Sequence, residues 1–71
     1  MKNKDELIYD LIFSDKCEFK IDISDYISDI YKYGEFVEEI KDILKKSKVK
    51  ISSNSVNLGS KTVIWELKVK K

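Results

Sequence analysis

The chain has 71 residues, of which 42% are apolar and 38% are charged, with a net charge of +1 and no proline. A disordered segment would contain fewer aliphatic and aromatic residues, so this composition predicts one folded domain with a small core over residues 1–71. No apolar run reaches the roughly 18 to 20 residues that a membrane crossing requires, and we therefore expect a cytoplasmic protein outside the membrane.

Residues that carry most catalytic and metal-binding chemistry are scarce in this sequence. There is no histidine and only one cysteine, Cys17, so an intrachain disulfide is impossible and a zinc site would depend on carboxylates alone. Histidine is also the usual general base at neutral pH, and the carboxylates are scattered over faces that the pattern predicts to be solvated. We expect no enzyme activity, no metal and no cofactor, and we interpret Cys17 as a small apolar core residue.

The charges are distributed unevenly along the chain. Residues 1–44 contain six lysines and twelve acidic residues, whereas residues 45–71 contain eight lysines and one acidic residue, Glu66. A basic C-terminal part favours an anionic partner. All fourteen basic residues are lysine, which leaves the chain poorly equipped to recognise guanine by paired hydrogen bonds. AT-biased codon usage explains the absence of arginine without any functional cause.

The N-terminal third predicts a helix followed by a strand. Asn3 is a good N-cap and is followed by Asp5 and Glu6, which favour the positive end of a helix over residues 4–13. Apolar residues recur there at helical spacing, at Leu7, Ile8, Leu11 and Ile12. Residues 17–23, CEFKIDI, alternate strictly between apolar and polar and predict a half-buried strand.

Residues 24–47 have the longest helical periodicity in the chain, which Gly34 interrupts. The stripe consists of Ile27, Ile30, Tyr33, Val37, Ile40 and Leu44. In one interpretation, a short helix ends in a turn at residues 32–34, and a second helix covers residues 35–46 with acids first and lysines last. In the other, one helix over residues 24–46 runs through Gly34 at a cost of about 1 kcal/mol. The mean length of helices favours the first interpretation.

The C-terminal part predicts an antiparallel hairpin. Residues 48–52 and 62–70 alternate between apolar and polar, and Trp65 lies on the inward face as the expected centre of the core. The polar segment SSNSVNLGSK joins the two strands and predicts a long loop over residues 52–61. Val56 and Leu58 either extend the pairing or lie at the tip.

The order helix, strand, helix, turn, helix and hairpin resembles the winged helix-turn-helix superfamily over residues 4–70. The likeness rests on the order of elements and on the turn at Gly34. We therefore expect a small α+β winged helix-turn-helix domain with the order α-β-α-α-β-β, or α-β-α-β-β if the central helix is continuous. What the resemblance implies is binding of double-stranded DNA, with helix 35–46 in the major groove and the loop 52–61 as the wing.

The residues favour DNA contacts from the hairpin over contacts from the helix. Acidic side chains occupy the first turns of helix 35–46, where DNA phosphates would repel them. We expect a small DNA-binding transcriptional regulator whose lysine-rich hairpin contacts phosphates, with Ser55 and Ser60 as further polar residues of the tip. The predicted nucleic-acid-binding residues are Lys45, Lys46, Lys48, Lys50, Asn54, Asn57, Lys61, Lys68 and Lys70. Lysines on an edge hairpin are also explained as protection against aggregation.

The alternative function is a protein-binding module on the same scaffold. An acidic helix can imitate DNA, and a small phage or mobile-element inhibitor of a host nucleic-acid enzyme would use such a surface. Exposed tyrosines and an isoleucine that points away from the core are typical of protein interfaces. The residues predicted for this interface are Tyr31, Tyr33, Glu35, Glu38, Glu39, Asp42 and Ile64. The small core and the heptad-like stripe also leave a homodimer open.

Overall fold

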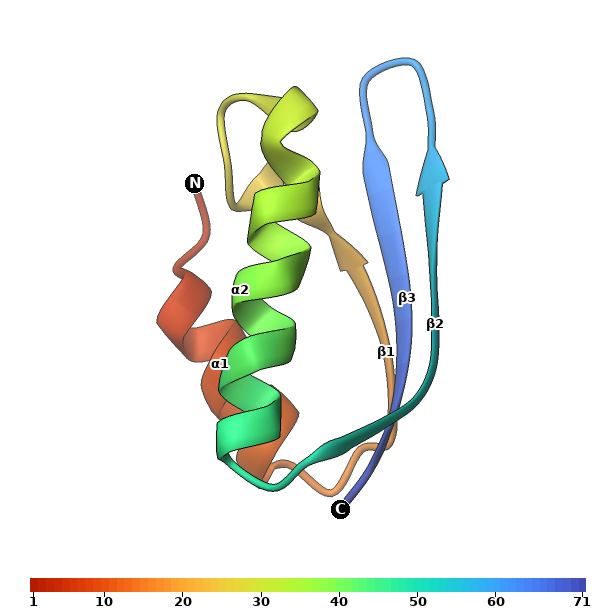
Figure 1. The fold of residues 1–71 in the computed structure, drawn as a ribbon. Helices are drawn as coiled ribbons and strands as arrows, with labels where there is room; N and C mark the ends of the chain where they lie inside the picture. Colours follow the sequence, from red (N-terminus) through yellow and green to blue (C-terminus); the bar gives the residue numbers. More distant parts are fainter.

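Two helices cover one face of a three-stranded antiparallel sheet in the computed structural model, which describes residues 1–71 (Figure 1). The elements in chain order are helix α1 (Lys4–Phe13), strand β1 (Glu18–Asp22), the 3₁₀ turns η1 (Ile23–Asp25) and η2 (Ile30–Lys32), helix α2 (Tyr33–Lys46), and strands β2 (Lys50–Leu58) and β3 (Val63–Lys70). The order of strands is β1-β3-β2, so β1 pairs with β3 of the hairpin. The expected α+β class is confirmed. Neither helix has the length and apolar character that a membrane crossing requires.

Helix α1 forms where the sequence predicts it. The side chain of Asn3 accepts a hydrogen bond from the backbone N–H of Asp5 at 2.8 Å, which satisfies one of the free amides at the start of the helix. Leu7 and Leu11 are the buried residues of α1. An ion pair of 2.7 Å between Lys4 Nζ and Glu39 Oε1 links the start of α1 to α2.

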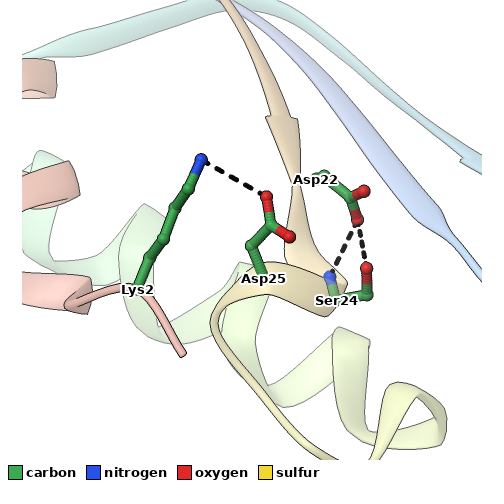
Figure 2. Close-up of polar contacts among 4 residues, drawn as sticks. All are labelled: Lys2, Asp22, Ser24 and Asp25. Carbon is green, nitrogen blue, oxygen red and sulfur yellow. Dashed lines mark hydrogen bonds and ion pairs between the residues drawn. The ribbon is translucent and has the colours of Figure 1, made fainter.

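Residues 24–32 do not form the predicted α-helix, in either the short or the continuous version. Asp22 accepts hydrogen bonds from the backbone N–H and the hydroxyl of Ser24 at 3.0 and 2.5 Å and starts η1 (Figure 2). Asp29 accepts from the backbone N–H of Tyr31 at 3.1 Å and starts η2. Such short polar side chains compete with helical hydrogen bonds because they bond nearby amides themselves. Gly34 consequently lies in the first turn of α2, and not in a turn between two helices.

The N-terminal segment holds η1 in place. The backbone N–H of Lys2 donates to the backbone oxygen of Asp25 at 2.7 Å, and the ammonium of Lys2 lies 3.4 Å from the carboxylate of Asp25 (Figure 2). The rings of Tyr26 and Phe36 stack with their centroids 5.7 Å apart, which joins the segment after η1 to α2. These contacts fix the chain between β1 and α2 without an α-helix.

The hydrophobic core lies between the two helices and the sheet. Trp65 is completely buried, which confirms its predicted place, although its indole N–H has no hydrogen-bond partner. The other fully enclosed side chains come from both helices, η1 and β3: Leu11, Ile23, Ile40, Leu44, Leu67 and Val63. Cys17 is exposed, so its interpretation as a core residue is wrong. It precedes β1, beyond the part of the strand whose inward residues are buried.

The hairpin is longer than predicted and its turn is shorter. Strand β2 continues to Leu58, and residues 54–58 pair with residues 63–67 of β3, so the expected loop over residues 52–61 is mostly strand. Only residues 59–62 form the turn, which the backbone N–H of Gly59 closes by donating to the oxygen of Thr62 at 2.8 Å. A bulge interrupts the register between Ile51 and Ser53. Val56 and Leu58 therefore extend the pairing, which was one of the two outcomes left open.

Candidate functional site

Helix α2 ends in a motif that reverses the chain and leads directly into β2. The N–H of Lys48 donates to the oxygen of Lys45 at 3.1 Å, and the N–H of Val49 donates to the oxygen of Leu44 at 2.9 Å. This pair of bonds defines a Schellman motif, in which an apolar contact usually accompanies the hydrogen bonds. Val49 and Leu44 are both buried in the core. The motif thus anchors the chain on its apolar residues and leaves the lysines between them at the surface.

Lys48 has an uncommon backbone conformation. Its φ of 63° makes it the only residue other than glycine with a positive φ, and it occupies the position of the Schellman motif at which glycine is most frequent. A side chain in this left-handed region costs about 1–2 kcal/mol. A strained residue of this kind is a reason to look for a function at the site.

Four lysines surround one open hollow at this end of the molecule. The hollow has a volume of about 700 Å³ and is lined by Lys41, Lys45, Lys48, Val49, Lys50 and Ile51, which together we call the lysine hollow. No acidic residue lines it. Lys45, Lys48 and Lys50 form no ion pair, and Lys41 lies 3.7 Å from the carboxylate of Glu38. The site therefore has positive charge that the protein itself does not neutralise.

A fifth lysine adds to this charge from strand β3. Lys70 is directly opposite Lys50 in the register of the β2–β3 pair, and Lys70 likewise forms no ion pair. Like charges opposite one another on neighbouring strands are destabilising. A bound anion between the two ammonium groups would remove that repulsion.

The structure divides the predicted nucleic-acid-binding residues into separate groups. Lys45, Lys48, Lys50 and Lys70 come together at the lysine hollow and beside it. Lys46 and Lys68 instead form ion pairs, with Asp42 at 3.0 Å and with Glu18 at 3.5 Å.

The remaining predicted residues lie further along the hairpin. Asn54 and Asn57 are in β2, and Lys61 is in the turn, at the opposite end of the hairpin from Lys50. A nine-residue strand spans about 30 Å, so Lys61 cannot contact the same group as Lys50.

Lys41 belongs to the lysine hollow but was not among the predicted residues. It is four residues before Lys45 on α2, a spacing that places two side chains on the same helical face. That spacing was visible in the sequence. The count of charges over residues 1–44 nevertheless placed Lys41 in the acidic part of the chain, because acidic residues outnumber lysines there.

The residues of the alternative protein interface are dispersed and partly neutralised. Glu39 pairs with Lys4, Asp42 with Lys46, and Glu38 with Lys41, so only Glu35 of the four acids has no lysine partner. Tyr31 is 91% exposed in η2, whereas Tyr33 is half-buried at the start of α2. Ile64 is half-buried on β3. The structure therefore shows a weaker acidic surface than the count of acidic residues predicted.

Side chains for other chemistry are not grouped. No three residues among the cysteine, aspartate and glutamate side chains come together in an arrangement that could hold a metal ion. Comparisons with protein-family models, with curated proteins and with solved structures find no match to this chain. The lysine hollow is thus the feature of the molecule from which a function is best inferred.

Proposed function

We propose that this protein binds nucleic acid, most directly double-stranded DNA, through contacts between backbone phosphates and the lysine hollow. The observation that carries the proposal is that the helix end and the start of β2 bring Lys41, Lys45, Lys48 and Lys50 around one hollow without an acidic residue. Lysine side chains are among the groups that contact and neutralise backbone phosphates in protein–DNA complexes. A small regulator that associates with DNA is the role that fits such contacts.

The strain at Lys48 supports this proposal independently of the charge count. Glycine would satisfy the Schellman motif at lower cost, whereas lysine adds an ammonium group on a flexible stem at this position. Two unpaired lysines facing each other across β2 and β3 point to the same requirement, because they repel unless an anion is bound.

The proposed contacts are with the DNA backbone and not with base edges. The first turns of α2 present Glu35 and Glu38, both exposed, which phosphates would repel from the major groove. Lysine also binds phosphate as a point charge, without the paired geometry by which arginine recognises guanine. We therefore expect affinity that depends strongly on salt and weakly on sequence.

The test is a salt titration of binding to a fluorescently labelled mixed-sequence duplex, measured by anisotropy. The hollow variant carries Lys45→Gln, Lys48→Gln and Lys50→Gln. The control variant carries Lys16→Gln, Lys20→Gln and Lys32→Gln, which removes the same charge from three other exposed lysines that form no ion pair.

The two variants are expected to differ in their salt dependence. Each lost phosphate contact lowers the slope of log K against log salt by about 0.9, so the hollow variant should lose about 2 to 3 units of slope. The control variant should retain most of its slope. Equal losses in both variants would show that binding follows net charge alone, and no binding by the unaltered protein at low salt would refute the proposal.

A further inference from the structure

The two edges of the sheet differ in how they are protected. Strand β1 is a five-residue edge with three charged residues, Glu18, Lys20 and Asp22. Strand β2 is a nine-residue edge whose last eight residues, 51–58, include no charge and no proline. Proteins normally protect exposed edges with charge, proline or short length, because unpaired backbone groups accept another strand. The β1 edge follows this rule, whereas the β2 edge does not.

The backbone groups that β2 leaves free can be assigned from two hydrogen bonds. The N–H of Val69 donates to the backbone oxygen of Cys17, and the N–H of Gly59 donates to the backbone oxygen of Thr62. Hydrogen-bonded pairs alternate along antiparallel strands, so the residues of β2 bonded to β3 are 53, 55 and 57 in the observed register. The N–H and C=O groups of Asn54, Val56 and Leu58 therefore point to the free edge.

The side chains of these three residues lie on the helix side of the sheet but are not covered by the helices. Asn54, Val56 and Leu58 are opposite Leu67, Trp65 and Val63, all of them buried in the core. Leu58 is nevertheless 64% exposed and Val56 is only half-buried. Figure 1 shows the reason, since β2 is the strand on the far side of β3 from β1 and the helices. Apolar surface thus adjoins the free edge.

We propose that β2 pairs antiparallel with β2 of a second copy of this chain, around a two-fold axis at Val56. Val56 is then opposite Val56 of the second copy, and Asn54 is opposite Leu58 of the second copy. Asn54, Val56 and Leu58, whose backbone groups face the free edge, each belong to a hydrogen-bonded pair with two bonds. The pairing ends before the bulge between Ile51 and Ser53. The two sheets become one sheet of six strands.

A second copy fits this edge because the strand is complementary to itself. The two-fold axis places the free N–H and C=O groups of each chain opposite the C=O and N–H groups of the other. Because both chains use the same surface, the assembly is complete with two chains. Val56 of each copy then contacts Val56 of the other, and Leu58 contacts Asn54 of the other. Lys50 and Lys61, the nearest charged residues along the chain, both lie outside the paired stretch 54–58, so no like charges are directly opposite one another in the new pairing. An interface of one strand pair is smaller than the standard size of about 1,200–2,000 Å², so we expect a weak dimer.

The first experiment measures mass and amide exchange on the intact protein as a function of concentration. Sedimentation equilibrium from about 10 µM to about 1 mM covers the range in which a small interface of this kind dissociates. The apparent mass should rise toward that of two chains. Over the same range the Val56 amide should become at least about tenfold more protected from hydrogen exchange, because it is free in the monomer and bonded in the dimer. The Ser55 amide, which is bonded to β3, should be protected throughout. A single-chain mass at the highest concentration, or a dimer in which the Val56 amide stays unprotected, would overturn the proposal.

Variants at Asn54 separate the backbone from the side chain. Asn54→Pro removes an N–H that faces the free edge and leaves the hydrogen bonds to β3 intact, whereas Asn54→Ala keeps that N–H. We expect the proline variant to remain monomeric at concentrations at which the alanine variant dimerises, with circular dichroism showing that both are folded.

A second pair of variants decides the matter if the proline variant does not fold. Asn54→Lys with Leu58→Lys places lysine directly opposite lysine twice in the dimer, while Ser60→Lys adds charge in the turn beyond the paired stretch. The double variant should be monomeric and the turn variant should dimerise. Dimerisation of the double variant as strongly as the unaltered chain would show that another surface forms the contact.

Discussion

Replacing Lys48 with glycine should stabilise the fold and weaken DNA binding at the same time. Lys48 has a φ of 63° at the end of α2. Relief of the left-handed strain gains about 1–2 kcal/mol. The greater freedom of glycine in the unfolded chain offsets about 0.4–1 kcal/mol of that gain. The net stabilisation is about 0.5–1 kcal/mol, which for a domain of this size raises Tm by roughly 3–6 °C.

The matched control is the same substitution three residues earlier. Lys45 is in the last turn of α2 and also lines the lysine hollow. Lys45→Gly should therefore destabilise the helix by up to about 1 kcal/mol. Each variant removes one lysine from the hollow, so each should lower the salt slope of DNA binding by about 0.9. Stability changes in opposite directions while binding changes in the same direction, which separates the two effects.

Thermal unfolding followed by circular dichroism measures the first effect, and anisotropy with a labelled duplex measures the second. If Lys48→Gly lowered Tm, the strain assigned to the left-handed conformation would be refuted. If Lys48→Gly raised Tm and left the salt slope unchanged, the strain would stand and the proposed contact of Lys48 with phosphate would not.

Three further predictions concern stability. Gly34→Ala should stabilise the protein by up to about 1 kcal/mol in urea unfolding, because Gly34 is helical and an added Cβ would meet no atom within 4 Å; a destabilised variant would contradict this. Asn3→Ala should cost about 1 kcal/mol in the same assay by removing the cap that bonds the N–H of Asp5, and an unchanged midpoint would show that the cap contributes nothing. Trp65→Phe should cost much less than the roughly 3–5 kcal/mol expected for Trp65→Ala, since it also removes a buried indole N–H that has no partner, and equal losses would refute that reasoning.

The sequence predicted best those parts of the fold that depend on local patterns. Asn3 caps α1 because its side chain needs only the amide two residues ahead, and Trp65 is central because strict alternation places it on the buried face. The apolar stripe over residues 24–33 also identified residues that contact the core, since Ile27, Ile30 and Tyr33 pack against it. The prediction that residues 24–32 form an α-helix was wrong because capping by Asp22 and Asp29 favours 3₁₀ turns, a competition that apolar spacing does not reveal.

The extent of β2 and the shape of the site were harder to predict. Small polar residues on both faces of residues 52–57 hide the alternation of a strand, and the pairing depends on β3, which follows later in the chain. Lys45, Lys48 and Lys50 were predicted together because they are neighbours in sequence. Lys48 adopts a left-handed conformation, and Lys41 joins the hollow from the preceding helical turn. Both depend on how α2 ends, which no single residue type in the sequence predicts.

The proposed dimer and the proposed DNA contact together predict that affinity depends on duplex length. An axis through Val56 perpendicular to the sheet places both lysine hollows on one side of the molecule. Because the bulge adds one residue to β2, Lys50 lies five ladder steps from Val56, and Lys50 of one chain is separated from Lys50 of the other by ten steps, or about 33 Å along the strands. A duplex of about 30 base pairs spans both hollows, whereas one of about 8 base pairs, roughly 27 Å long, reaches only one. Above the dimer's dissociation constant, Asn54→Pro should therefore weaken binding to the long duplex about tenfold or more through lost bivalency and leave binding to the short duplex unchanged. Equal weakening on both duplexes would mean that Asn54→Pro damages the hollow itself, and no weakening on either would mean that each chain binds DNA alone.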